Sequence, residues 1–75
     1  MGSVLFEINM LEEGNEKRLL LQSYQNAKKY IYQKDSKALK TVVSRLNGLY
    51  PVMSKKAQEI SVMLVNEINK EADQE

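Results

Sequence analysis

The chain has 75 residues, of which 43% are hydrophobic and 28% charged, and its net charge is +1. This length suffices for one domain with a small core and not for two. The absence of Cys and His excludes a disulfide framework, a zinc-finger ligand set and nucleophiles activated by histidine. Only three Gly and one Pro favour helices over a turn-rich β-sandwich.

Residues 1–15 form an N-terminal lead-in, in which residues 1–3 have the composition of a tag remnant. The segment has no basic region typical of a signal peptide, and no window of the chain reaches the roughly 20 apolar residues of a membrane span. We therefore expect a cytoplasmic protein. Residues 4–11 are apolar but too short for periodicity to decide between helix and strand. We expect a helical lead-in that packs Leu5, Phe6 and Ile8 on the rest, with a strand as the alternative.

A first helix is predicted over residues 16–33, where apolar side chains recur at steps of three and four. The stripe consists of Leu20, Tyr24, Ala27 and Ile31, widened by Leu21 and Tyr32. Asn15 is the expected N-cap. The break at residues 34–36 reverses the chain, with Asp35 or Ser36 as the next N-cap.

A second helix is predicted over residues 36–48, with Gly48 as the left-handed residue that ends it. Its stripe consists of Leu39, Val42, Val43, Leu46 and Leu49. The third helix begins at Pro51, or after Ser54 as N-cap, and reaches about Ala72, with residues 73–75 frayed. Its stripe consists of Met53, Ala57, Ile60, Leu64 and Ile68, with Ser61 beside it. These stripes predict an all-α fold, an antiparallel three-helix bundle over residues 16–75.

Charge is distributed unevenly along the chain. Residues 16–56 carry ten bases and two acids, whereas residues 57–75 carry one base and five acids. A segment with a net charge of +8 can bind an acidic partner or phosphates, although lysines also simply solvate outer helix faces. A helix-turn-helix is disfavoured, because the break at residues 47–51 is long and the third helix carries Glu59, Glu67 and Glu71. Nucleic acid is therefore not the expected partner.

The candidate partner surface combines cations of the first two helices with one tyrosine: Arg18, Lys29, Tyr30, Lys37 and Lys40. Tyr30 and Tyr32 flank the first stripe on opposite sides, where either one can anchor a partner. Met10, Met53 and Met63 are interpreted as core filling, with an adaptable binding groove as the alternative. The carboxylates form no clustered or His-paired set, so no metal site, cofactor site or catalytic residue is predicted.

A resemblance to a known family is carried by residues 24–31, the charged reversal at 33–38, the pattern Leu39-Lys40-x-x-Val43-x-x-Leu46, and Ala57 and Ile60 after it. Through these residues the chain resembles the C-terminal helical lid of the 70-kilodalton heat-shock (DnaK-type) chaperones. The resemblance implies a helical subdomain that covers a neighbouring peptide-binding domain in response to ATP bound elsewhere.

The resulting prediction is a non-catalytic helical interaction module of the chaperone-lid kind, whose partner is a neighbouring domain or another protein. The alternative is a small autonomous regulator that binds an acidic protein or nucleic acid through its basic helical face. Neither prediction includes an enzyme activity, a cofactor or a membrane.

Overall fold

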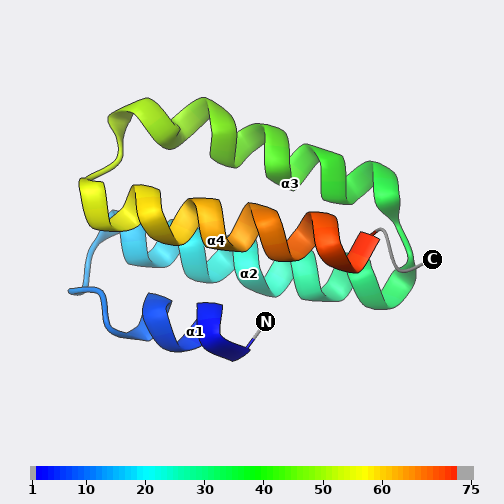
Figure 1. Cartoon of the computed structure of the whole chain (residues 1–75), viewed down its shortest axis with the longest axis horizontal. Coiled ribbons are helices and arrows are strands. Elements are labelled where there is room, and N and C mark those ends of the chain that lie inside the picture. Colours follow the sequence, from blue (N-terminus) through cyan, green and yellow to red (C-terminus); the bar gives the residue numbers. More distant parts are fainter. Residues whose placement is uncertain (1, 73–75) are drawn as a thin grey trace.

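The computed structural model describes residues 2–72, which form helices joined by short breaks. The elements are α1 (Gly2–Asn9), α2 (Asn15–Gln33), α3 (Ser36–Leu49), the 3-10 turn η1 (Tyr50–Val52) and α4 (Lys55–Ala72) (Figure 1). This range contains no strand, so the predicted all-α class is confirmed. The predicted frayed tail, residues 73–75, lies outside the described residues.

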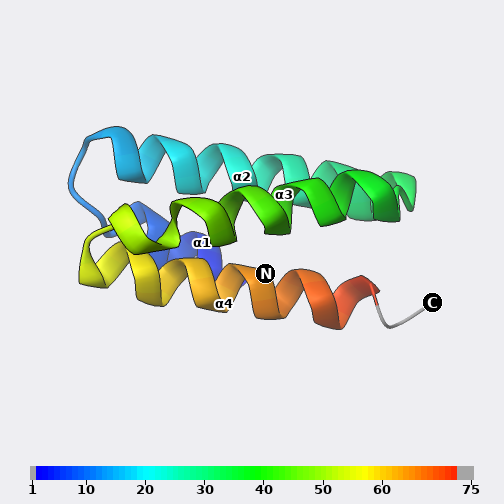
Figure 2. The same ribbon diagram turned by 90° about the horizontal axis from the view of Figure 1, so that it is seen from above.

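Helices α2 and α4 lie side by side and run in the same direction, and α3 runs antiparallel to both along one side of the pair (Figures 1 and 2). Helix α1 runs antiparallel to the pair on its other side; it contacts α2 and α4 and, within residues 2–72, not α3. Eight residues make α1 about 12 Å long, against about 28 Å for the 19 residues of α2. It therefore covers only the half of the pair where α2 and α4 begin (Figure 1).

The lead-in thus forms a regular helix, α1, in addition to the three predicted ones, and the alternative of a strand is wrong. Val4 and Ile8 are its buried residues, because a spacing of four places both on one face. Leu5 is half-buried and packs at the core edge. Phe6 is 63% exposed, which corrects the prediction that it packs inward. Two residues correspond to about 200° of helical rotation, so Phe6 points away from the face that Val4 and Ile8 share.

The apolar stripes of the three long helices meet in one core, as predicted. Burial of a Leu or Ile side chain stabilises the fold by about 2 kcal/mol, and most positions of each stripe are buried. These are Leu20, Tyr24 and Ala27 of α2, Leu39, Val42 and Leu46 of α3, and Met53, Ala57, Ile60, Leu64 and Ile68 in or before α4. Ile31, Val43 and Leu49 are partly buried against them.

The reversal between α2 and α3 consists of Lys34 and Asp35. Lys34 adopts the left-handed conformation with φ 56°, and the N–H of Asp35 donates to the carbonyl of Tyr30 at 2.9 Å. This hydrogen bond, from Asp35 back to the residue five positions earlier, is typical of a helix end whose left-handed position is usually occupied by glycine. Asp35 then caps α3, since its Oδ1 accepts a hydrogen bond from the N–H of Ala38 at 3.1 Å. The predicted N-cap role of Asp35 is confirmed.

Two other predicted cap residues, Asn15 and Gly48, are wrong. Asn15 is the first residue of α2, and Gly14 precedes it as a cap without a side-chain hydrogen bond. Gly48 does not end α3 in a left-handed conformation, because the helix continues through Leu49 and passes into η1. Pro51 fits within the first turn of η1, because an N–H at this position has no partner within the helix and its absence costs no hydrogen bond.

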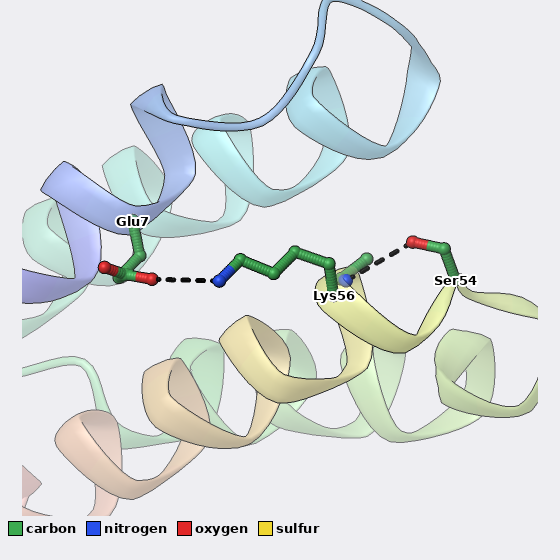
Figure 3. A network of polar contacts seen from close by, with 4 residues as sticks. Glu7, Ser54 and Lys56 are labelled. Carbon is green, nitrogen blue, oxygen red and sulfur yellow. Dashed lines mark hydrogen bonds and ion pairs between the residues drawn. The ribbon is translucent and has the colours of Figure 1, made fainter.

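Helix α4 begins after Ser54, which settles the choice between the two predicted starts. The Oγ of Ser54 accepts a hydrogen bond from the N–H of Ala57 at 3.3 Å, as an N-cap does (Figure 3). Just beyond the cap, Lys56 forms an ion pair of 3.4 Å with Glu7, which joins α4 to α1 (Figure 3). Such an exposed pair contributes little, on the order of 0.5 kcal/mol.

None of the helices within residues 2–72 combines the length and the apolar character that crossing a bilayer requires.

Candidate functional site

Five exposed lysines gather where α2 ends and α3 begins. Lys28 and Lys29 lie in the last turns of α2, Lys34 in the reversal, and Lys37 and Lys40 in the first turns of α3. The reversal is only two residues long, so the two groups of helical lysines are held at the same end of the bundle (Figure 1). We call these five residues the lysine cluster.

The one acid within the same stretch of sequence does not neutralise the lysine cluster. Asp35 is the single acidic residue between positions 28 and 40, which leaves this stretch with a net charge of +4 (five lysines and one aspartate). The Asp35 carboxylate accepts a hydrogen bond from the backbone of Ala38 and forms no ion pair with a described lysine. Since the five ammonium groups have no ion-pair partner among residues 2–72, their charge is available to another molecule.

The other two residues of the predicted partner surface are placed differently. Arg18 is exposed but lies in the first turn of α2, eleven residues and about 16 Å along the helix from Lys29. The structure therefore brings Lys29, Lys37 and Lys40 to one end and leaves Arg18 near the other. Tyr30 is half-buried and packs against the core, so its ring is largely used within the bundle.

Tyr32 is 90% exposed, which corrects the prediction that it widens the core stripe of α2. It follows Ile31 by one residue, or about 100° of helical rotation, and this turns it from the core to the outer face. There it lines a shallow hollow with Gln25, Lys28 and Lys29. An exposed aromatic ring between lysines is a typical anchor in an interface. Tyr24, in contrast, is buried in the core as expected.

A groove of about 630 Å³ runs between α3 and α4 next to the lysine cluster. Three apolar residues, Leu39, Val43 and Ile68, form its floor. Within the part of the chain that the structure describes, its rim carries polar and cationic side chains and no carboxylate: Ser36, Lys40, Ser44, Asn47 and Asn69. This volume is within the range of ordinary ligand pockets, about 300–1,000 Å³, although the groove is open along its length.

The three methionines considered as a binding groove lie apart. Met53 is buried, in agreement with its interpretation as core filling. Met10 is 65% exposed beside Ser54 and Lys56, which corrects its interpretation as core filling. Met63 is half-buried and packs against the core, in a separate hollow with Tyr50. These placements do not support an adaptable methionine groove.

The carboxylates near the start of α2 act within the fold. Lys17 donates to Glu13 at 2.8 Å, and this hydrogen bond together with the lysine charge lowers the pKa of Glu13. Hydrogen bonds from the backbone and hydroxyl of Ser54 lower the pKa of Glu16. Among residues 2–72, no group of three or more acidic side chains lies close enough to hold a metal ion. That the chain is not an enzyme and takes no cofactor stays a prediction.

We compared the chain with protein-family models, curated proteins and solved structures, and none of them matches it. The resemblance to the chaperone lid therefore stays a prediction that rests on the residues named above.

Sequence reasoning missed Lys28 and Lys34 as members of the basic surface, and the groove altogether. One signal was available: α3 contains Lys37, Lys40 and Arg45 and no acid in its 14 residues. No pattern in the sequence indicated that Asn69 lines the groove, because only the packing of α4 against α3 places it there.

Proposed function

We propose that this chain is a non-catalytic helical interaction module that binds an acidic protein surface through the lysine cluster. The observation that carries the proposal is the concentration of five exposed lysines, without ion-pair partners among the described residues, at one end of a rigid bundle. Such a cluster accelerates encounter with a partner of opposite charge and orients it during docking. The exposed ring of Tyr32 adds an apolar contact beside Lys28 and Lys29.

The position of the other cations favours a protein over duplex DNA. Lys55 and Lys56 lie at the start of α4, at the end of the bundle opposite the lysine cluster, and Lys56 is paired with Glu7. Helix α4 also carries Glu59, Glu67 and Glu71, which would face phosphates if it entered a groove. The length of the bundle therefore separates the lysine cluster from Lys55 and Lys56, and these cations form no continuous track for a phosphate backbone.

The finer form of the proposal is that the module covers a neighbouring peptide-binding domain, as the lid of the 70-kilodalton heat-shock chaperones does. Its support is the resemblance, whose residues lie in α2, the reversal, α3 and the first turns of α4 and include all five members of the lysine cluster. Docking of the cluster on an acidic edge of that domain would bias an equilibrium between open and closed forms. The reading frame of the gene tests this form: an ATPase and a β-sandwich encoded upstream support it, and a frame of only this length contradicts it.

The binding proposal is tested by titrating a fluorescent polyglutamate peptide with the chain at several salt concentrations. The double substitution Lys37→Glu and Lys40→Glu is expected to weaken binding about tenfold at low salt. Its matched control is Arg18→Glu with Lys55→Glu, which makes the same charge change at the opposite end and is expected to weaken binding about threefold or less. Equal effects of the two double variants, or equally tight binding to duplex DNA, would contradict the proposal.

A further inference from the structure

The groove between α3 and α4 adds a second element to the surface that the lysine cluster begins. Lys40 belongs to both, since it is a member of the cluster and also lines the groove. The floor is apolar, and Val43 is its most exposed residue, because Leu39 and Ile68 are almost fully buried. Binding is favoured when a partner's apolar side chains replace water over Val43. The site therefore combines apolar and cationic groups within one continuous surface.

The charge around this groove identifies the partner's chemistry. Helix α3 has three cations and no acid over its whole length, and Asn69, the α4 rim residue among residues 2–72, is neutral. A segment that inserts apolar residues and carries carboxylates on its flanks would meet no like charge on the rim. A basic segment would meet Lys40, and a cationic side chain placed there would be repelled.

The dimensions favour a helix as the bound form. From Ser36 to Asn47 the groove follows α3 for eleven residues, or about 16 Å, which corresponds to about three turns of a second helix. Apolar residues of an amphipathic helix recur at steps of three and four, so over three turns they form one stripe that can lie along the groove.

We infer that the α3–α4 groove binds an acidic amphipathic helix of the partner, with its apolar stripe along Val43 and a carboxylate at Lys40. This inference rests on the proposed function, whose acidic partner it makes specific. The lysine cluster attracts and orients the segment, and the groove selects those acidic segments whose apolar residues have helical spacing.

Two synthetic peptides of identical composition test the inference. Both consist of Leu and Glu over about three to four turns; in the first the leucines recur at steps of three and four, and in the second they are moved to break this spacing. The first peptide is expected to bind about tenfold more tightly, because only it presents a continuous apolar stripe. Binding is measured by fluorescence anisotropy at low salt.

A matched pair of variants locates the bound peptide. Ser44→Glu places a carboxylate on the groove rim, and Thr41→Glu places the same charge at an exposed position of α3 outside the groove. Ser44→Glu is expected to weaken the first peptide about tenfold and Thr41→Glu about threefold or less. Circular dichroism melting checks that both variants stay folded.

Each outcome separates the inference from the proposed function. If the two peptides bind equally, or the two variants weaken binding equally, the groove is not the site and the inference is overturned. The proposed function survives that result, provided that Lys37→Glu with Lys40→Glu still weakens both peptides. If neither peptide binds at low salt, both the inference and the proposed function fail.

Discussion

Glu16 of α2 receives two hydrogen bonds from Ser54, a residue 38 positions later in the chain. The Ser54 N–H donates to Oε2 at 2.6 Å and its hydroxyl donates to Oε1 at 2.8 Å. In a capping box, a glutamate three residues after the N-cap binds the N-cap amide. That position of α4 is Ala57, which cannot accept a hydrogen bond through its side chain, and Glu16 of another helix takes the role. The start of α4 is thus tied to the start of α2.

Substitution of this cap is expected to destabilise the fold. Ser54→Ala removes the acceptor of the Ala57 N–H and one of the two donors to Glu16, and the expected loss of unfolding free energy is about 1 kcal/mol. Urea denaturation measures it. Ser44→Ala is the matched control, since at an exposed position inside α3 alanine has the higher helix propensity and the change is neutral or slightly stabilising. A loss no larger than that of the control would contradict the role of Ser54.

The tie also predicts a pH dependence of stability. Hydrogen bonds from Ser54 lower the pKa of Glu16 in the folded state relative to the unfolded chain. The contribution of Glu16 is therefore complete above the ordinary pKa of a glutamate, about 4.3, and is lost as the pH falls through the lower, folded value. Between about pH 5 and 3, Glu16→Gln should unfold with a shallower pH dependence than the unsubstituted chain.

Ser54→Ala is the control for this measurement. It keeps the backbone hydrogen bond, which is the larger cause of the lowered pKa of Glu16, so most of the pH dependence should remain. An unchanged slope in Glu16→Gln would show that other carboxylates, such as Glu13, account for the acid sensitivity.

Gly48→Ala is expected to stabilise the protein. Gly48 lies inside α3 without a positive φ, and a Cβ atom added there would meet nothing within 4 Å. Alanine in a helix interior is favoured over glycine by about 0.5–1 kcal/mol. Thermal unfolding followed by circular dichroism measures the gain. Gly14→Ala should give no such gain, because Gly14 is an N-cap, where alanine is disfavoured. A lower melting temperature of Gly48→Ala would contradict this, and would indicate that Gly48 has the left-handed conformation predicted from the sequence.

Lys34→Gly is expected to stabilise the reversal between α2 and α3. Lys34 has a φ of 56°, a conformation that costs an L-residue about 1 kcal/mol and glycine almost nothing. Lys34→Ala removes the same charge without relieving this backbone, so only the glycine variant should gain stability. Denaturant midpoints compare the two. Equal midpoints would show that charge repulsion within the lysine cluster, and not the backbone, sets the effect.

Two substitutions in α1 test how this helix packs on α2 and α4. Ile8 is fully buried, so Ile8→Ala should cost about 2–4 kcal/mol. Phe6 is mostly exposed, so Phe6→Ala should change the unfolding free energy by less than about 0.5 kcal/mol. Equilibrium denaturation provides both values. Similar losses for the two variants would contradict the packing of α1 seen here.

Local sequence patterns were sufficient to predict the three long helices. The stripe from Leu20 to Ala27, the one from Leu39 to Leu46 and the one in α4 were predicted residue by residue, because burial of a helix face imposes a 3.6-residue period. Asp35 was also predictable, since a cap contacts its own helix within one turn. Residues 2–9 carried too few turns for periodicity to distinguish a helix from a strand.

What no local pattern contained was the pairing of groups distant in the chain. The hydrogen bonds of Glu16 to Ser54, the contact of Lys56 with Glu7 and the groove that joins Lys40 to Asn69 exist only because four helices pack in one arrangement. The sequence determined which face of each long helix is apolar, since that depends on spacing along a single helix. The tertiary structure decided which exposed residues share a surface, because the distance between side chains of different helices is set by how those helices are placed against each other.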